Sequence, residues 1–207
     1  MFSDELEMLW PTPVATRIFN EVQEFNTHLE KTILELQKTD IGKNKSNCMG
    51  WHSTGNLFQN TSPELEDLQE IILQFISDYV VEVSQKKEQV GVKLFAWANV
   101  LNSGGYNNVH NHPNSHISGV YYINTGELDS NNPNSGLIAF SDPRAGAGMV
   151  SSSYLDFGAS YQYTPEPGML LLFPAYLWHW VHPFTGQGQR ITVSFNANLI
   201  EPIELKS

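Results

Sequence analysis

Residues 91–123 read GVKLFAWANVLNSGGYNNVHNHPNSHISGVYYI, and this stretch decides the class of fold. Its first and last parts, Val92 to Leu101 and Ile117 to Ile123, are rich in the β-branched and aromatic residues that are typical of strands. The polar run Asn102 to Asn108 between them has the glycines and asparagines of a turn. Short strands separated by turns predict an antiparallel sandwich or barrel.

The same pattern of strands and turns continues almost to the end of the chain. Further strands are expected over Gly136 to Phe140, Ser152 to Tyr163, Met169 to Phe173 and Arg190 to Leu199. The segments between them are rich in Gly, Asn, Pro and Ser, as turns require. The second half of the chain is therefore expected to be almost entirely β.

The first 90 residues have a different pattern. Apolar residues recur every three or four positions from Phe19 to Thr39, which predicts an amphipathic helix. Asn44 to Asn60 has the composition of a loop. The sequence TSPE at Thr61 to Glu64 predicts a second helix, with a capping hydroxyl and a proline in its first turn, that runs to about Gln85. We expect one domain over residues 1–207, with a helical part at 1–90 and a β core at 91–200.

Composition excludes several classes of function. The chain has 207 residues, of which 41% are hydrophobic and 12% aromatic, enough for the core of one domain. Its 22 acidic and 11 basic residues give a formal charge of −11, so a nucleic-acid partner is not expected. The single cysteine, Cys48, excludes an internal disulfide and a thiolate metal cluster. We find no signal peptide or membrane segment and expect a cytoplasmic protein.

The histidines are concentrated in the β-rich half of the chain. Five of the seven are in this half: His110, His112, His116, His179 and His182. Residues i and i+2 of a strand point to the same side, so His110 and His112 can direct both imidazoles at one metal ion. His179 is the best candidate for a third ligand, because it follows an apolar strand and precedes Arg190. His116 and His182 are expected to have structural roles.

Several motifs together resemble those of a known family of enzymes. They are His110-Asn-His112, Ser118 to Tyr122, Phe140 to Arg144, Phe173-Pro174, His179 and Arg190 to Asn196, with Leu9 to Val14 and Gly50-Trp51 nearer the N-terminus. These motifs resemble the 2-oxoglutarate/iron(II) oxygenases related to prolyl hydroxylases. The resemblance implies a double-stranded β-helix, which is a jelly-roll of the cupin type. It also implies a hydroxylating dioxygenase that uses iron(II), 2-oxoglutarate and dioxygen.

The resemblance also implies roles for individual residues. His110 and His179 occupy the positions of the two iron-binding histidines, and Arg190 that of the arginine that pairs with the distal carboxylate of 2-oxoglutarate. Thr192 is expected to offer a hydroxyl to the same carboxylate. Asn99 and Tyr121 are expected to complete the cosubstrate pocket. The substrate is expected to be a small molecule or a peptide, with a prolyl or another amino-acid residue as the point of reaction.

One position departs from the family pattern. The commonest iron site of this type has two histidines and one carboxylate, and His112 stands at the carboxylate position. Two alternatives follow: a three-histidine dioxygenase that uses no cosubstrate, and a metal-stabilised jelly-roll binding module without activity. Asp142 is an alternative source of a carboxylate, if its turn folds inward. A homodimer that pairs through the apolar face of the first helix is a further expectation.

Overall fold

The computed structural model describes residues 9–86, 90–150, 152–154 and 158–200 of the chain. Its helices are α1 (Gln23–Thr39), α2 (Pro63–Ser84) and the short 3-10 turns η1 (Leu57–Gln59) and η2 (Ala147–Met149). None of the helices in these ranges is long and apolar enough to cross a membrane.

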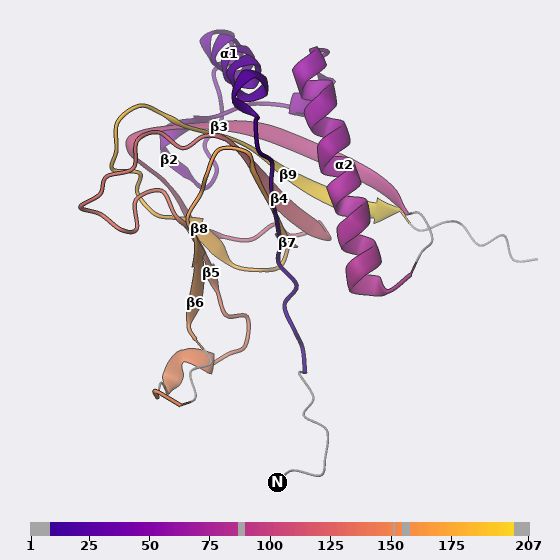
Figure 1. The fold of residues 1–207 in the computed structure, drawn as a ribbon, viewed down its shortest axis with the longest axis vertical. Helices are drawn as coiled ribbons and strands as arrows, with labels where there is room; N and C mark the ends of the chain where they lie inside the picture. The colour runs from indigo at the N-terminus through magenta and orange to yellow at the C-terminus, as the bar shows by residue number, and fades with distance from the viewer. Residues whose placement is uncertain (1–8, 87–89, 151, 155–157, 201–207) are drawn as a thin grey trace, which may run out of the picture.

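The strands form one antiparallel sheet. They are β1 (Ala15–Ile18), β2 (Asn47–His52), β3 (Gly91–His110), β4 (Ile117–Asn124), β5 (Ile138–Ser141), β6 (Ser160–Tyr163), β7 (Met169–Pro174), β8 (His179–Val181) and β9 (Arg190–Ile200). Their order is β1-β7-β4-β9-β3-β8-β5-β6, and β2 pairs with β3 outside this path. The sheet curls, and β5 and β6 extend away from α1 (Figure 1). The fold is the double-stranded β-helix that the sequence predicted.

The two-residue period of the strands divides the buried side chains into two cores. One core lies between the sheet and the helices, and it includes Tyr121 of β4 and Val193 of β9. The other lies on the opposite face, and it includes Val120 and Tyr122 of β4. Because alternate residues point to opposite faces, neighbours in sequence have different environments.

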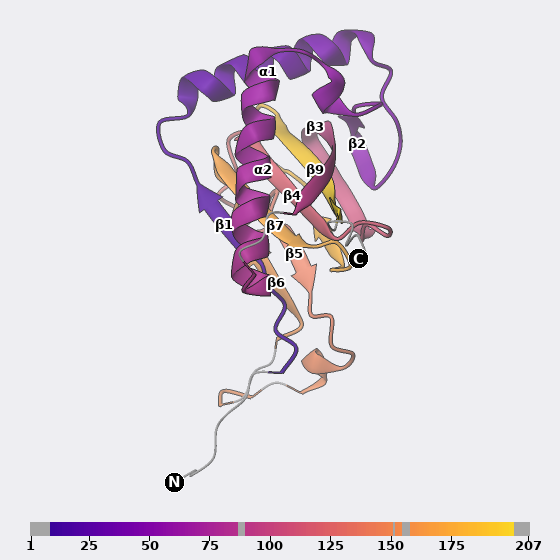
Figure 2. The same ribbon diagram turned by 90° about the vertical axis from the view of Figure 1, so that its right-hand side faces the viewer.

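The helices cover one face of the sheet. In Figure 2, α2 lies along the sheet and α1 crosses near one end. The apolar face of α1 is buried there, since Leu29 and Ile33 are 0% exposed and belong to the core between the helices and the sheet. This face was expected to form a dimer interface, and it is instead used within the chain. The dimer itself stays a prediction.

Three local expectations were wrong. Residues 102–108 are not a free turn but part of β3, where the register against β2 shifts and Gly104 N–H donates to the carbonyl of Phe184 at 2.7 Å. The expected loop at 44–60 contains β2 and η1. Ser62 precedes α2 as expected, but its hydroxyl makes no capping hydrogen bond.

The strand expected over Ser152 to Tyr163 is shorter than predicted. Within its described residues only Ser160–Tyr163 is a strand, paired with β5. Residues 151 and 155–157 lie outside the described part of the chain.

Candidate metal centre

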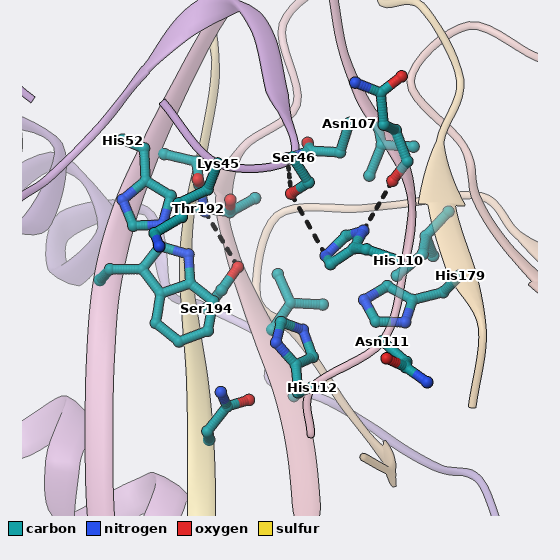
Figure 3. A pocket seen from close by; sticks show the side chains of 18 of the residues that line it. Lys45, Ser46, His52, Asn107, His110, Asn111, His112, His179, Thr192 and Ser194 are labelled. Carbon is teal, nitrogen blue, oxygen red and sulfur yellow. Dashed lines mark hydrogen bonds between the residues drawn. The ribbon is translucent and has the colours of Figure 1, made fainter. Parts of the chain in front are cut away.

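Strand pairing brings the three predicted metal ligands together. His110 ends β3 and lies directly opposite His179, the first residue of β8, with ring centroids 4.2 Å apart. His112 follows two residues later, and its ring centroid lies 5.0 Å from that of His110 and 5.1 Å from that of His179. One nitrogen from each ring lies within 4.8 Å of the others, and Figure 3 shows the three side chains around one point. This arrangement suits a single metal ion.

Backbone carbonyls orient two of the three imidazoles. The Nδ1 atom of His110 lies 2.7 Å from the carbonyl oxygen of Asn108, and Nδ1 of His179 lies 2.8 Å from that of Leu177. A carbonyl oxygen only accepts hydrogen bonds, so each Nδ1 carries the proton and each Nε2 keeps its lone pair. Nε2 is then the metal-binding atom of both rings. The hydroxyl of Ser46 lies 3.3 Å from Nε2 of His110.

Burial keeps the three imidazoles neutral. It lowers the pKa of His112 to about 4 and that of His179 to about 3, with a smaller contribution from repulsion by His110. Burial also lowers the pKa of His110. A neutral imidazole is the form that binds a metal, so all three rings are ready to do so at neutral pH.

The histidines open into a cavity of about 640 Å³. Arg190 also lines this cavity, is only 2% exposed, and has its guanidinium carbon 5.0 Å from the ring centroid of Tyr122. Two buried polar atoms of the cavity have no hydrogen-bond partner within the described part of the chain, Nε of Arg190 and Oδ1 of Asn99, while the hydroxyl of Tyr122 interacts with the guanidinium of Arg190. Such atoms are costly unless a ligand pairs with them.

Most of the predicted cosubstrate residues line this cavity, with one correction. Asn99 and Thr192 do so, and they lie opposite each other on β3 and β9. Tyr121 does not, because its hydroxyl donates to Oδ1 of Asn26 at 2.8 Å on the helix side of the sheet. Its neighbour Tyr122 faces the cavity instead. The choice of Tyr121 was therefore wrong by one residue, which on a strand means the wrong face.

The alternative carboxylate ligand is engaged elsewhere. Oδ1 of Asp142 accepts from N and Nε of Arg144 at 2.8 and 3.0 Å, and Oδ2 accepts from Nη2 at 2.6 Å. Asp142 does not line the cavity of the histidines. Its Asp-Pro-Arg sequence therefore forms a turn at the surface.

The two remaining histidines of the β half have structural contacts. The backbone N–H of Leu199 donates to Nδ1 of His116 at 3.0 Å, and Nε1 of Trp180 donates to Nε2 of His182 at 3.2 Å. Neither histidine belongs to the cluster of possible metal ligands among the described residues. This agrees with the structural roles expected for both.

An aromatic wall borders the histidines. His52 stacks on Trp97 with ring centroids 5.4 Å apart and planes at 4°, and Trp97 lies 5.7 Å from His112. Phe95 continues the wall. His52 lies in the segment expected to be a loop, and only the pairing of β2 with β3 places it here.

Fold and site together define a β-helix protein with a cluster of three histidines that could hold a metal ion, beside a buried arginine in the same cavity. Residues 95–196 match the model of a family described as "Putative 2OG-Fe(II) oxygenase". This segment contains all three clustered histidines and Arg190, so over the part that carries the site the chain resembles the 2OG-Fe(II) oxygenases, a family of hydroxylating enzymes. No curated protein sequence gives a significant match.

Solved structures of the same fold include several 2-oxoglutarate oxygenases. A prolyl-4-hydroxylase of Pseudomonas putida is 11% identical, with a TM-score of 0.63 over 91% of this chain and 93% of that one. A prolyl hydroxylase of Trichoplax adhaerens, in complex with a peptide fragment of the hypoxia inducible factor, is 10% identical, with a TM-score of 0.64 over 89% and 83%. HygX of Streptomyces hygroscopicus, with nickel and 2-oxoglutarate bound, is 11% identical, with a TM-score of 0.61 over 90% and 83%.

Proposed function

We propose that the chain acts as a single oxygenase domain in which His110, His112 and His179 hold iron(II) and Arg190 holds 2-oxoglutarate. The reaction proposed is hydroxylation of an amino-acid residue in a peptide, with proline as the first candidate. The observation that carries this proposal is the shared cavity, in which three neutral imidazoles lie beside a buried arginine that forms no ion pair with an acidic group of the described residues.

The donor set fits iron(II). Imidazole suits iron as well as zinc or copper, and three imidazoles on one side of an ion leave positions free for other ligands. The carbonyls of Asn108 and Leu177 fix two of the rings in the tautomer that binds through Nε2. Such outer hydrogen bonds also make the imidazole a better ligand.

The pocket around Arg190 fits a dicarboxylate. A guanidinium that is 2% exposed carries a large desolvation cost, and an incoming carboxylate offsets this cost through two parallel hydrogen bonds. The hydroxyl of Tyr122, which lies beside the guanidinium of Arg190, is a further donor in the same cavity. Thr192 follows Arg190 by two residues on β9, so its hydroxyl lies on the same side of the strand and also lines the cavity.

Iron(II) with 2-oxoglutarate supplies the oxidising chemistry when bound: the keto acid is decarboxylated to succinate, and one oxygen atom of dioxygen is placed in a C–H bond of the substrate. The residues of the chain do the positioning. Arg190 fixes one end of the cosubstrate, and the histidines fix the other by holding the metal. The buried walls of Phe173 and Val181 keep water from the reacting atoms.

The aromatic wall supports a substrate residue of modest size and apolar character. Trp97, with His52 stacked behind it and Phe95 beside it, offers a flat surface next to the metal site. A pyrrolidine ring packs well on such a surface, because its C–H groups are attracted by the face of an aromatic ring. The Trichoplax relative was solved with a peptide, which supports the choice of a peptide substrate.

His112 favours one competing function, a three-histidine dioxygenase without a cosubstrate. It replaces the carboxylate of the common triad by a neutral ligand. That function leaves Arg190 with a structural role or with a carboxylate of the substrate itself to bind, and because it does not by itself supply an anion for this buried guanidinium we place it second. Dependence of oxygen consumption on 2-oxoglutarate separates the two.

The direct test of the proposed function is turnover. Protein loaded with iron(II) is given 2-oxoglutarate and air, and succinate and consumed oxygen are measured with and without candidate peptides. We expect slow succinate formation that requires both iron and 2-oxoglutarate, is lost in His179→Ala, and accelerates with a peptide that is hydroxylated. Oxygen consumption that proceeds equally without 2-oxoglutarate would support the competing dioxygenase instead.

A further inference from the structure

The active-site cavity is basic although the chain as a whole is acidic. Three basic side chains, those of Lys43, Lys45 and Arg190, line it, and none of the described lining residues is Asp or Glu. The chain carries only 11 basic residues against 22 acidic ones. Exclusion of acidic side chains is therefore a local property of this cavity.

The two lysines are held at the rim by the segment that leads into β2. Nζ of Lys43 lies 5.8 Å from the ring centroid of Phe95, and its backbone N–H donates to the carbonyl of His52 at 2.9 Å. The backbone N–H of Lys45 donates to Oδ1 of Asn47 at 2.8 Å. Figure 3 places Lys45 on the side of the cavity that holds His52 and Ser46. Both ammonium groups are thus close to the wall proposed for the substrate.

Neither lysine is neutralised by a carboxylate of the described residues. The ion pairs there are Arg17–Asp78, Lys38–Glu35 and Arg144–Asp142, and they include neither lysine. The carboxylate of Asp40 interacts electrostatically with Lys43. It accepts hydrogen bonds from Gly42 and Thr54, however, and it does not line the cavity. The ammonium groups are therefore available to a ligand.

The replacement of a carboxylate by His112 adds to the positive charge. This step rests on the proposed function. Iron(II) carries two positive charges and Arg190 carries one, against two negative charges on 2-oxoglutarate. With three neutral imidazoles the net charge is therefore +1, whereas a carboxylate in place of His112 would bring it to zero. Lys43 and Lys45 raise the excess to three. Uncompensated charge in a concave, partly buried site strongly favours an anionic ligand.

We propose that the substrate is an acidic peptide segment, in which an Asp or Glu side chain near the residue that enters the cavity pairs with Lys43 and Lys45. A compact acidic side chain fits the observations better than a long polyanion. The formal charge of −11 repels a polyanion that extends past the rim, while a single carboxylate at the rim interacts mainly with the nearest charges, because charges farther away than a Debye length, roughly 8 Å in physiological salt, are largely screened.

Short peptides with one proline and one glutamate at varied spacing test this proposal, together with twins in which glutamine replaces glutamate. Calorimetry measures their binding to the protein with manganese(II) and 2-oxoglutarate, and to the metal-free protein. We expect the best glutamate peptide to bind about tenfold more tightly than its twin. We expect Lys43→Ala and Lys45→Ala each to weaken it about fivefold, since an exposed ion pair contributes up to about 1 kcal/mol. Lys31→Ala, which removes an exposed lysine of α1 outside the cavity, is the matched control.

Three results would overturn the proposal: equal binding of the two peptide sets, a preference for glutamate that survives the loss of both lysines, or no binding of either set. An oligothymidylate that binds more tightly than the peptides and requires the lysines would assign the rim to nucleic acid instead. Failure of the proposed function is seen separately, as absence of 2-oxoglutarate binding before any peptide is added. The metal-free arm then still tests the lysines.

Discussion

Arg190→Met is expected to stabilise the ligand-free protein while it removes the cosubstrate site. Arg190 is 2% exposed, its Nε atom has no hydrogen-bond partner among the residues that the structure describes, and burial lowers the pKa of its guanidinium. Exchange of buried charged groups for apolar ones of similar volume often stabilises a protein by about 1–4 kcal/mol. At roughly 2–4 °C per kcal/mol for a chain of this size, the melting temperature should rise by at least about 2 °C.

The same variant should lose stabilisation by 2-oxoglutarate. A ligand at about 100 times its Kd stabilises the folded state by about 2.7 kcal/mol, which corresponds to roughly 5–11 °C here. Thermal unfolding of manganese-loaded protein with and without 2-oxoglutarate measures both effects, and Arg17→Met, at an exposed ion pair with Asp78, is the control. The reasoning is refuted if Arg190→Met melts lower than the parent protein, or if 2-oxoglutarate still raises its melting temperature.

Three further predictions follow from the site. Tyr122→Phe should weaken 2-oxoglutarate binding about 5- to 10-fold in calorimetry. Tyr121→Phe should leave binding unchanged and destabilise the protein by about 1 kcal/mol, because the hydrogen bond to Asn26 is lost. Equal effects of the two variants on binding would contradict the assignment of Tyr122 to the cavity face. The metal-free protein should lose stability as the pH falls, because the pKa values of His112 and His179 are lowered from 6.5 to about 4 and about 3, so that the unfolded chain takes up protons first. The stability that these two neutral histidines allow is fully present above about pH 6.5. Each should cost about 1 kcal/mol of stability between pH 7 and 5.5, and the loss with falling pH should be shallower in His179→Gln. His112→Asp should retain iron(II). His112→Ala should weaken metal binding by more than the roughly 10- to 100-fold that is typical when a group hydrogen-bonded to a ligand is lost. Full metal affinity in His112→Ala would exclude His112 as a ligand.

Local patterns explain why the fold and the cluster of histidines were predictable from the sequence. The strands β4, β7 and β9 are rich in apolar, aromatic and β-branched residues, and all three were found. The spacing of His110 and His112 restricted both rings to one side of the chain, and the resemblance supplied His179 and Arg190. Each of these inferences used local sequence or a motif.

The features that were missed depend on pairing between distant segments. β2 has an unremarkable composition and is a strand only because β3 offers it a partner, so neither His52 nor the lysines before it could be placed at the cavity. Tyr121 and Tyr122 are the same residue type side by side, and only the register of the sheet decides which one faces the cavity. Asn102 to Asn108 has the composition of a turn, but its backbone is paired with β2, β8 and Phe184.

If His110, His112 and His179 hold iron(II) next to an arginine that holds 2-oxoglutarate, the keto acid should chelate the metal. An anaerobic titration of iron(II)-loaded protein with 2-oxoglutarate, which follows the weak visible charge-transfer band of a chelated keto acid, measures this. We predict that the band appears, is lost in His112→Ala and requires much more 2-oxoglutarate in Arg190→Met. Absence of the band in protein that demonstrably retains iron would exclude 2-oxoglutarate as the cosubstrate.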